Sequence, residues 1–234
     1  DYVLFLRTKK KFEGHPFTPE SDEAIKNSSI RTYSRAVKSF LNYCKNEHYI
    51  EDYKKVKMPK NDARQIIPLY ADEVEKIDAT FNHHTIIGLR DFCIVHLMLD
   101  AGFRSQEVIN LKIQDVLFDK DALLVVNSKG SVSRIVIMCP CLKGNLWEYL
   151  RYYRHGSAPG DPVFIQIKNK APINENVIKQ YFARLKKRTG IDRLHPHLLR
   201  HTFATSYILG GGNLEMLRIL LGHSDYDITN NYLH

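Results

Sequence analysis

The chain has 234 residues, of which 44% are hydrophobic and 26% are charged, the ordinary balance of a soluble globular protein. Its length suits one large domain, or a small domain joined to a larger one. No apolar stretch approaches the ~20 residues that cross a bilayer, which excludes a membrane-spanning protein. The chain starts at Asp1 without the apolar core of a signal peptide, so we expect a piece of a longer cytosolic protein.

The net charge of +8 favours a polyanionic partner. DNA or RNA is the natural one, because neutralising phosphates releases counterions. A basic protein without such a partner has the same charge, so charge alone leaves both interpretations open. The four cysteines include one closely spaced pair, Cys139 and Cys141, with no second pair at zinc spacing. We therefore expect no metal site and a reducing compartment.

Two helices are predicted in the N-terminal segment. Residues 1–12 favour a short helix, which a polar stretch containing glycine and prolines ends. Ser28 or Ser29 can cap a second helix. The apolar residues of this second helix recur with helical period: Ile30, Tyr33, Val37, Phe40, Leu41 and Cys44. Its opposite face carries the basic residues Arg31, Arg35, Lys38 and Lys45. We predict that this face contacts DNA, with a merely solvated face as the alternative.

A basic stretch with two prolines, residues 54–68, has no sustained period and predicts an extended linker. Beyond it, helices are predicted at about 71–80, 84–101 (with Ile87 among its buried residues) and 104–110. Residues 113–138 predict two strands around the turn Asn127–Gly130. Later helices are predicted at about 141–154, 174–189, 196–209 and 213–221, with a last helical piece around Tyr232. We therefore predict a mainly α protein with a small antiparallel sheet (the α+β class), organised as a helical domain 1–56, a linker 57–68 and a larger domain 69–234.

Three short stretches of the larger domain combine residues that bind phosphate or react with it. The first is AGFRSQE at 101–107, with Arg104 at the start of a helix. The second is HPHLLRHT at 195–202, where His197 and Arg200 share one face of a helix N-terminus that favours anions. The third is Leu-Gly-His at 221–223, with Tyr232 nine residues later. Each stretch taken alone is compatible with an ordinary surface or core role.

Together these stretches resemble the tyrosine recombinase/integrase family, of the Xer and phage or transposon integrase type. The family's motif has an arginine in a G-x-R-x-x-E context, a lysine in a β-hairpin, an H-x-x-R pair, a histidine in L-G-H and a tyrosine nine residues on. The matching residues are Arg104, Lys129, His197, Arg200, His223 and Tyr232. The interval of 23 residues between Arg200 and His223 is also similar to that of Xer-type members.

The resemblance implies a chemistry that suits these residue types. A phosphodiester passing through a pentavalent transition state gains negative charge, so positive donors must surround it. Arg104 and Arg200 can each bind two phosphate oxygens, and His223 can add a donor. Tyr232 is the implied nucleophile, with an ordinary pKa of ~10 that requires a proton acceptor and nearby cations. By the same resemblance His197 is the base or phosphate-orienting group, and Lys129 is the acid.

The expected product is a 3′-phosphotyrosine with a free 5′-hydroxyl, formed without metal, ATP or another cofactor. We expect Glu107 to orient Arg104 rather than to react. The expected partners are double-stranded DNA, clamped by the two domains, and further copies of the chain, as a tetramer on two DNA sites. The resemblance also implies a cytoplasmic, nucleoid-associated protein encoded by a bacterium or a mobile element. Family members usually continue past the tyrosine into a further helix that docks on a neighbouring subunit, whereas this chain stops at His234. Either the chain is trimmed or the tail is absent, and stable assembly depends on which of the two holds.

The alternative function is that of a type IB topoisomerase-like enzyme, which uses similar phosphotyrosine chemistry to relax DNA. The sequence around Lys129 and the separate basic N-terminal segment favour a recombinase. A DNA-binding module without catalysis would lack one of the six motif positions, and a metal-dependent nuclease would need a carboxylate cluster that is not evident. The target sequence, and the choice between integration, excision and resolution, stay open.

Overall fold

The computed structural model describes residues 2–54, 56, 58, 59, 66–126 and 133–222. It divides into two compact units, Asp1–Gln65 and Ile66–His234. The division falls inside the predicted linker 57–68. Residues 66–68 belong to the second unit, where the main-chain oxygens of Ile66 and Pro68 accept hydrogen bonds from His201 and Arg193.

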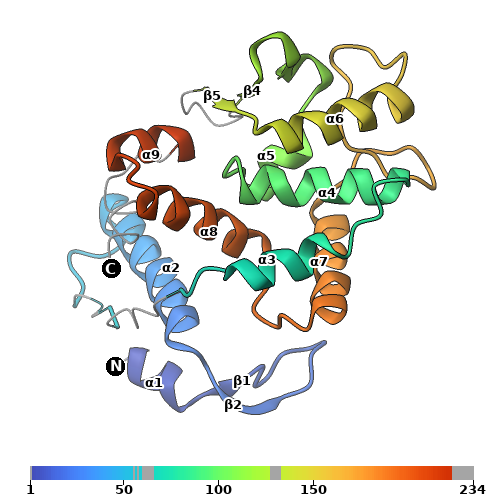
Figure 1. Ribbon diagram of the computed structural model, residues 1–234. Helices are drawn as coiled ribbons and strands as arrows, with labels where there is room; N and C mark the ends of the chain where they lie inside the picture. The colour runs from blue at the N-terminus through green and yellow to red at the C-terminus, as the bar shows by residue number, and fades with distance from the viewer. Residues whose placement is uncertain (1, 55, 57, 60–65, 127–132, 223–234) are drawn as a thin grey trace. The chain divides into compact units, whose positions relative to one another are not determined.

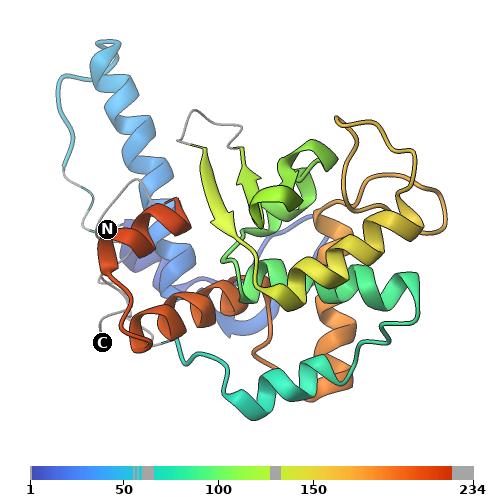
Figure 2. The same cartoon turned by 45° about the horizontal axis from the view of Figure 1, so that its top comes forward.

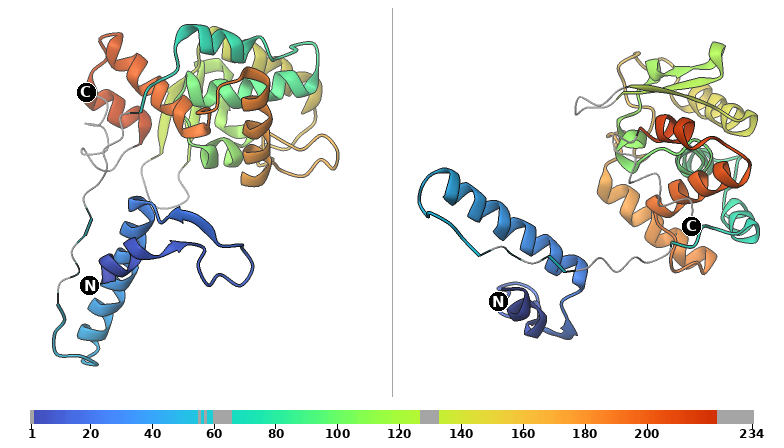
Figure 3. Two further views of the ribbon diagram at one scale, coloured as in Figure 1. Left: turned by 90° about the horizontal axis from the view of Figure 1, so that it is seen from below. Right: turned by 90° about the vertical axis from the view of Figure 1, so that its left-hand side faces the viewer.

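In its described residues, the first unit contains two helices and a two-stranded antiparallel ribbon, whose course can be followed in Figure 3. Its elements are α1 (Tyr2–Thr8), β1 (Lys10–Lys11), β2 (Ser21–Ala24) and α2 (Asn27–Asn46). The predicted helix over 1–12 is therefore wrong beyond Thr8. Lys10 and Lys11 pair with Asp22 and Glu23 at 2.9 and 3.0 Å, and these pairs across the ribbon favour strand over helix.

Helix α2 starts at Asn27, after Lys26, which provides no side-chain cap, rather than after Ser28 or Ser29. Among the residues of its predicted apolar face, Ile30 is buried, against Val3 and Leu6. Tyr33 and Phe40 are 48% and 63% exposed, so the apolar period of this helix does not correspond to a fully buried face. The cause is the small size of this unit's core, which covers only the first turns of the 20-residue helix.

The second unit is mainly helical (Figure 1). Its helices are α3 (Ala71–Asp78), α4 (Ile86–Leu99), α5 (Ser105–Asn110), α6 (Pro140–Tyr153), α7 (Glu175–Thr189), α8 (Pro196–Leu209) and α9 (Leu214–Leu221), with single 3₁₀ turns at η1 (Ile113–Asp115) and η2 (Phe118–Lys120). Asn174 and Asn213 cap α7 and α9 through their side chains, as short polar residues commonly do. These helices lie where the sequence predicts them.

Helix α4 is the centre of the second unit and packs against α6 and α8 (Figure 2). All but one of its residues from Gly88 to Leu99 are buried, as expected for a helix that is apolar on every side. Ile87, which we expected to be buried, is 51% exposed, although Gly88 and Leu89 in the same turn are buried, so its side chain lies on the outward side of the first turn. Ala204, Leu217 and Leu221 form a separate small apolar cluster between α8 and α9.

The predicted hairpin is confirmed as β4 (Ala122–Val125) and β5 (Arg134–Ile137), and a short additional strand, β3 (Val116–Leu117), pairs with β4. Val125 lies opposite Arg134, and the turn between them falls outside the described residues. Arg134 and Val136 point inward on β5, whereas Ile135 and Ile137 are exposed.

The predicted fold class, mainly α with small antiparallel sheets, is thus confirmed. Within the described ranges, no helix combines the length and the apolar character needed to span a membrane.

Candidate active site

Arg104 lies in the turn that joins α4 to α5. Gly102 turns the chain with a φ of +65°, and an added Cβ there would lie 2.6 Å from the ring of Phe203, so glycine is required. Arg104 then caps α5, where its backbone N–H donates to Glu107 Oε2 at 2.7 Å. Its side chain remains 35% exposed. The sequence thus fixes the backbone on both sides of an arginine that solvent can reach.

Arg200 lies on α8, which begins with His195 as N-cap and Pro196 in the first turn. Its side chain is only 6% exposed. The guanidinium donates to the main-chain oxygen of Gly102 and, at 2.6 Å, to that of Leu221. One side chain of α8 therefore joins the α4–α5 turn to the end of α9.

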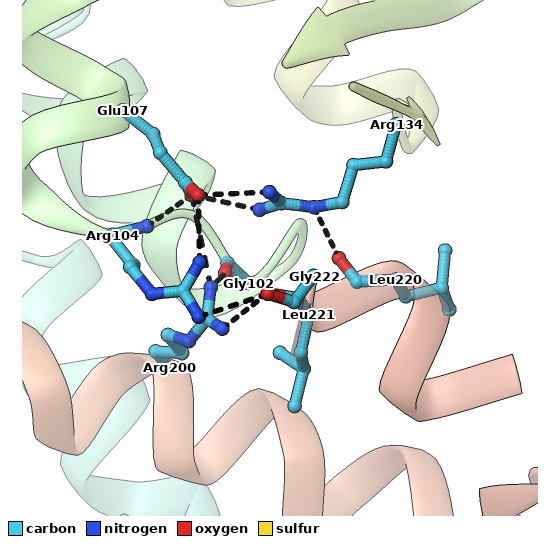
Figure 4. A network of polar contacts seen from close by, with 8 residues as sticks. All are labelled: Gly102, Arg104, Glu107, Arg134, Arg200, Leu220, Leu221 and Gly222. Atoms are coloured by element: carbon cyan, nitrogen blue, oxygen red, sulfur yellow. Dashed lines mark hydrogen bonds and ion pairs between the residues drawn. The ribbon is translucent and has the colours of Figure 1, made fainter. Parts of the chain in front are cut away.

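Glu107 accepts hydrogen bonds or ion pairs from three arginines (Figure 4). Arg134 binds it with both terminal nitrogens, at 2.8 and 2.7 Å. Arg104 Nη1 lies at 3.0 Å and Arg200 Nη1 at 3.7 Å. Burial acts to raise the pKa of Glu107, but the hydrogen bonds and charge of Arg134, with help from Arg104 and Arg200, hold that pKa below its ordinary value. The predicted pairing of Glu107 with Arg104 is present and belongs to a larger cationic cluster.

The same three arginines bind the last carbonyl groups of α9 (Figure 4). Leu220 accepts from Arg134 Nε at 2.5 Å, Leu221 from Arg200 at 2.6 Å and Gly222 from Arg104 at 3.4 Å. Carbonyls at a helix C-terminus have no partner within the helix and carry partial negative charge, which favours cations. The chain is thereby held up to the residue that precedes His223.

His197 is exposed in the first turn of α8, three residues before Arg200. His201 and Thr202, which follow Arg200, attach residues 66–69 to the same helix. His201 Nε2 lies 2.9 Å from the oxygen of Ile66, and Thr202 accepts from the N–H of Leu69 at 2.9 Å. These two side chains therefore hold the start of the second unit against α8.

Three of the six motif residues, Lys129, His223 and Tyr232, lie outside the described residues. Of the other three, Arg104 and Arg200 come together around Glu107, and His197 shares a helix with Arg200. The arrangement brings together the guanidinium groups of Arg104, at the N-terminus of α5, and of Arg200. Such a pair of guanidinium groups is suited to binding a phosphate group.

Arg134 is a residue of the site that the sequence motifs do not identify. Its side chain is 3% exposed and its Cζ lies 5.9 Å from the centre of the Phe103 ring. A signal was available, because strand alternation places position 134 on the same face as buried Val136. An arginine on the inward face of a strand requires an anionic partner.

The basic residues predicted to contact DNA lie on α2 of the first unit. Arg31 donates to the oxygen of Pro59 at 2.6 Å, and Lys45 pairs with Asp52 at 3.0 Å. Arg35 and Lys38 are exposed. In the part of the chain that the structure describes, no group of three or more His, Cys, Asp or Glu side chains is placed to hold a metal ion.

Comparison of the sequence with known proteins shows which family the chain belongs to. The sequence model of the phage integrase family matches residues 68–234. A tyrosine recombinase XerC of Staphylococcus aureus is 29% identical over 214 residues, which cover 90% of this chain and 71% of that protein. The chain therefore belongs to the phage integrase family.

Solved structures show the same fold. The crystal structure of XerA recombinase has a TM-score of 0.65 and 27% identity, covering 90% of this chain and 79% of that one. A Tn1549 transposon integrase in complex with circular intermediate DNA has a TM-score of 0.77 at 18% identity, covering 99% and 79%. XerH bound to a palindromic difH substrate has a TM-score of 0.76 at 18% identity, covering 99% and 67%.

The predicted resemblance to Xer-like tyrosine recombinases is thus confirmed, and with it the class of enzyme, one that breaks and rejoins DNA. The prediction of site-specific recombination is confirmed by the same family and relatives, and none of these comparisons favours the topoisomerase alternative.

Proposed function

We propose that this enzyme recombines double-stranded DNA through a covalent link to Tyr232. The observation that carries the proposal is the pairing of Arg104 and Arg200 around one buried carboxylate, next to the α9 end that leads to His223. Two guanidinium groups with fixed backbones form an anion site whose charge is already in place when the phosphate arrives. DNA-bound structures of the Tn1549 integrase and of XerH support DNA as the partner.

In the proposed reaction the phenolic oxygen of Tyr232 attacks the scissile phosphorus, and the bond from phosphorus to the 5′-oxygen breaks. The tyrosine proton passes to a base, for which His197 is the candidate, and Lys129 donates a proton to the leaving 5′-oxygen. Arg104, Arg200 and His223 bind the non-bridging oxygens as their charge increases. Attack by a 5′-hydroxyl on the phosphotyrosine reverses these steps and reseals a strand, so no ATP is needed.

We further propose that residues 1–56 form a DNA-binding domain and that 69–234 form the catalytic domain, joined by the linker 57–68. Arg35 and Lys38, exposed on α2, are the stronger candidates for DNA contacts in the first domain. Arg31 and Lys45 already contact Pro59 and Asp52 of their own unit. DNA phosphates would have to replace these partners or bind beside them. Recombination joins four strand ends, which requires several copies of the chain, and we propose a tetramer on two sites in the cytoplasm, at the nucleoid.

Trapping the covalent intermediate tests the proposal. The full chain is incubated with a library of nicked duplexes, which lose a short fragment after cleavage, and the DNA attached to protein is sequenced. We expect a defined site, joined to Tyr232 through a 3′-phosphate, with the same yield in EDTA. Tyr232→Phe should give no covalent product while its DNA affinity stays within about threefold, because only the nucleophilic oxygen is lost.

The matched control is Tyr152→Phe, which removes the hydroxyl of an exposed tyrosine on α6 and should cleave like the parent. Covalent product from Tyr232→Phe would refute the assignment of the nucleophile. Cleavage that requires Mg²⁺ would instead indicate a nuclease.

A further inference from the structure

Arg134 uses all three of its guanidinium nitrogens within the site, yet it is not one of the six motif residues. Its Nε and both terminal nitrogens donate to Leu220 and Glu107 at 2.5–2.8 Å. The guanidinium also lies next to the Phe103 ring, and a Cβ added to Gly222 would come within 3.0 Å of Nη1. At 3% side-chain exposure, Arg134 is enclosed by the protein, whereas Arg104 is 35% exposed.

The pairing around Glu107 is unequal in a way that bears on phosphate binding. Arg134 takes the bidentate position, Arg104 makes one guanidinium contact at 3.0 Å, and Arg200 lies at 3.7 Å. A carboxylate without Arg134 would draw one of the other two guanidiniums into the bidentate pair, which is the stronger geometry. That arginine would then be neutralised at the moment when a phosphate needs it.

Arg134 also connects two segments that lead to motif residues. It is the first residue of β5, five positions after Lys129 in the sequence, and it binds Leu220 at the end of α9, three positions before His223. An arginine can hold both, because its planar fork and its Nε point in different directions. Lysine has a single nitrogen and cannot reproduce this pattern.

We propose that Arg134 is a positioning residue for DNA cleavage: it neutralises Glu107 and fixes the end of α9, so that Arg104 and Arg200 keep the positions from which they bind the scissile phosphate. The inference rests on the proposed function and deepens it. Arg134 itself does not touch the DNA.

The test is single-turnover cleavage of the nicked duplex recovered by trapping, at saturating DNA, by full-length variants. Arg134→Met should lower the rate constant by roughly 100-fold, since small misplacements of catalytic groups have effects of this size. Arg134→Lys should fall in between, at about 10-fold. Thermal unfolding is recorded for each variant, and cleavage is measured well below the lowest midpoint.

Arg90 provides a matched control outside the site. It is also a largely buried arginine, 11% exposed, that binds a carboxylate (Asp91) with two nitrogens and a main-chain oxygen (Ile165) with a third. Arg90→Met should lower the unfolding midpoint as Arg134→Met does, but its rate constant should stay within about threefold of the parent. A merely structural effect lowers the fraction of chains that react and leaves the rate constant of the folded chains unchanged.

The double variant Arg134→Met with Glu107→Gln provides a second measurement. Removing the uncompensated carboxylate should restore the rate constant at least 10-fold over Arg134→Met alone, because no buried negative charge then competes with the phosphate for Arg104 and Arg200. A parental rate constant in Arg134→Met, a loss confined to reaction amplitude, or no recovery in the double variant would overturn the inference. A parent chain that forms no covalent product would overturn the proposed function as well, so the two failures are distinguishable.

Discussion

Raising the pH should destabilise the second unit through one buried histidine, His96 on α4. Its Nδ1 lies 2.7 Å from Asp100 and its Nε2 lies 2.9 Å from Asp78, and the side chain is 9% exposed. Burial acts to lower the pKa of His96, but the two hydrogen-bonded carboxylates outweigh it and raise the pKa to about 9. Both ring nitrogens face an acceptor, so the folded protein holds this histidine in its charged form.

The size of the effect follows from the difference between the folded and unfolded states. An unfolded histidine has a pKa of about 6.5, and one pKa unit corresponds to about 1.4 kcal/mol. Because the folded pKa is raised, the stabilisation is fully present below pH 6.5 and is lost as the pH rises toward 9. Between pH 6.5 and 8.5, the free energy of unfolding should therefore fall by roughly 2–3 kcal/mol.

Urea unfolding followed by tryptophan fluorescence measures this change in the free energy of unfolding, and its signal comes from the second unit, which contains His96. The chain has one tryptophan, Trp147 on α6 of the second unit, packed edge-on against Phe118. His96→Gln should abolish the pH dependence in this range, whereas His155→Gln, which removes an exposed histidine, should keep it. The same fall in His96→Gln as in the parent, or a flat profile in the parent, would refute the reasoning.

Two further changes test the site directly. Gly102→Ala forces a Cβ into a residue with a φ of +65°, 2.6 Å from the Phe203 ring, and should lower the free energy of unfolding in urea by about 2–4 kcal/mol. Gly144→Ala, on open helix surface, should raise it by about 0.5–1 kcal/mol, and the opposite order would contradict the backbone argument. Lys129→Ala should lose cleavage of ordinary DNA yet recover on a 5′-phosphorothiolate, whose leaving group scarcely needs an acid; no recovery in a gel assay would exclude Lys129 as the acid.

The helices of the second unit were predictable because their start and stop signals and their apolar residues are local in the sequence. Helix α4, a long apolar run, needs no partner to be recognised as buried. The first unit was predicted less well, since its ribbon depends on pairs such as Lys10 with Asp22, twelve residues apart. The exposure of Tyr33 and Phe40 on α2 likewise depends on what the rest of the unit covers, which the helical period of α2 does not report.

The candidate site was predictable in its residues but not in its connections. Arg104, His197 and Arg200 lie in recognisable sequence motifs. The role of Arg134 depends instead on a contact with Glu107, 27 residues away. The binding of carbonyls 220–222 by three separate arginines is a property of the packed unit. No local pattern encodes it, because each donor comes from a different element.

Helix α9 has a small apolar cluster of its own, Ala204, Leu217 and Leu221, outside the main core. Opening it would expose few buried side chains, so it should unfold locally at a lower free energy than α4, with faster amide hydrogen exchange. Such an opening would also withdraw the carbonyls of Leu220 and Leu221 from the arginines. The last turn of α9 and the anion site should therefore fold and unfold together as one cooperative unit. A phosphate bound by the arginines would then slow amide hydrogen exchange in α9 without contacting that helix.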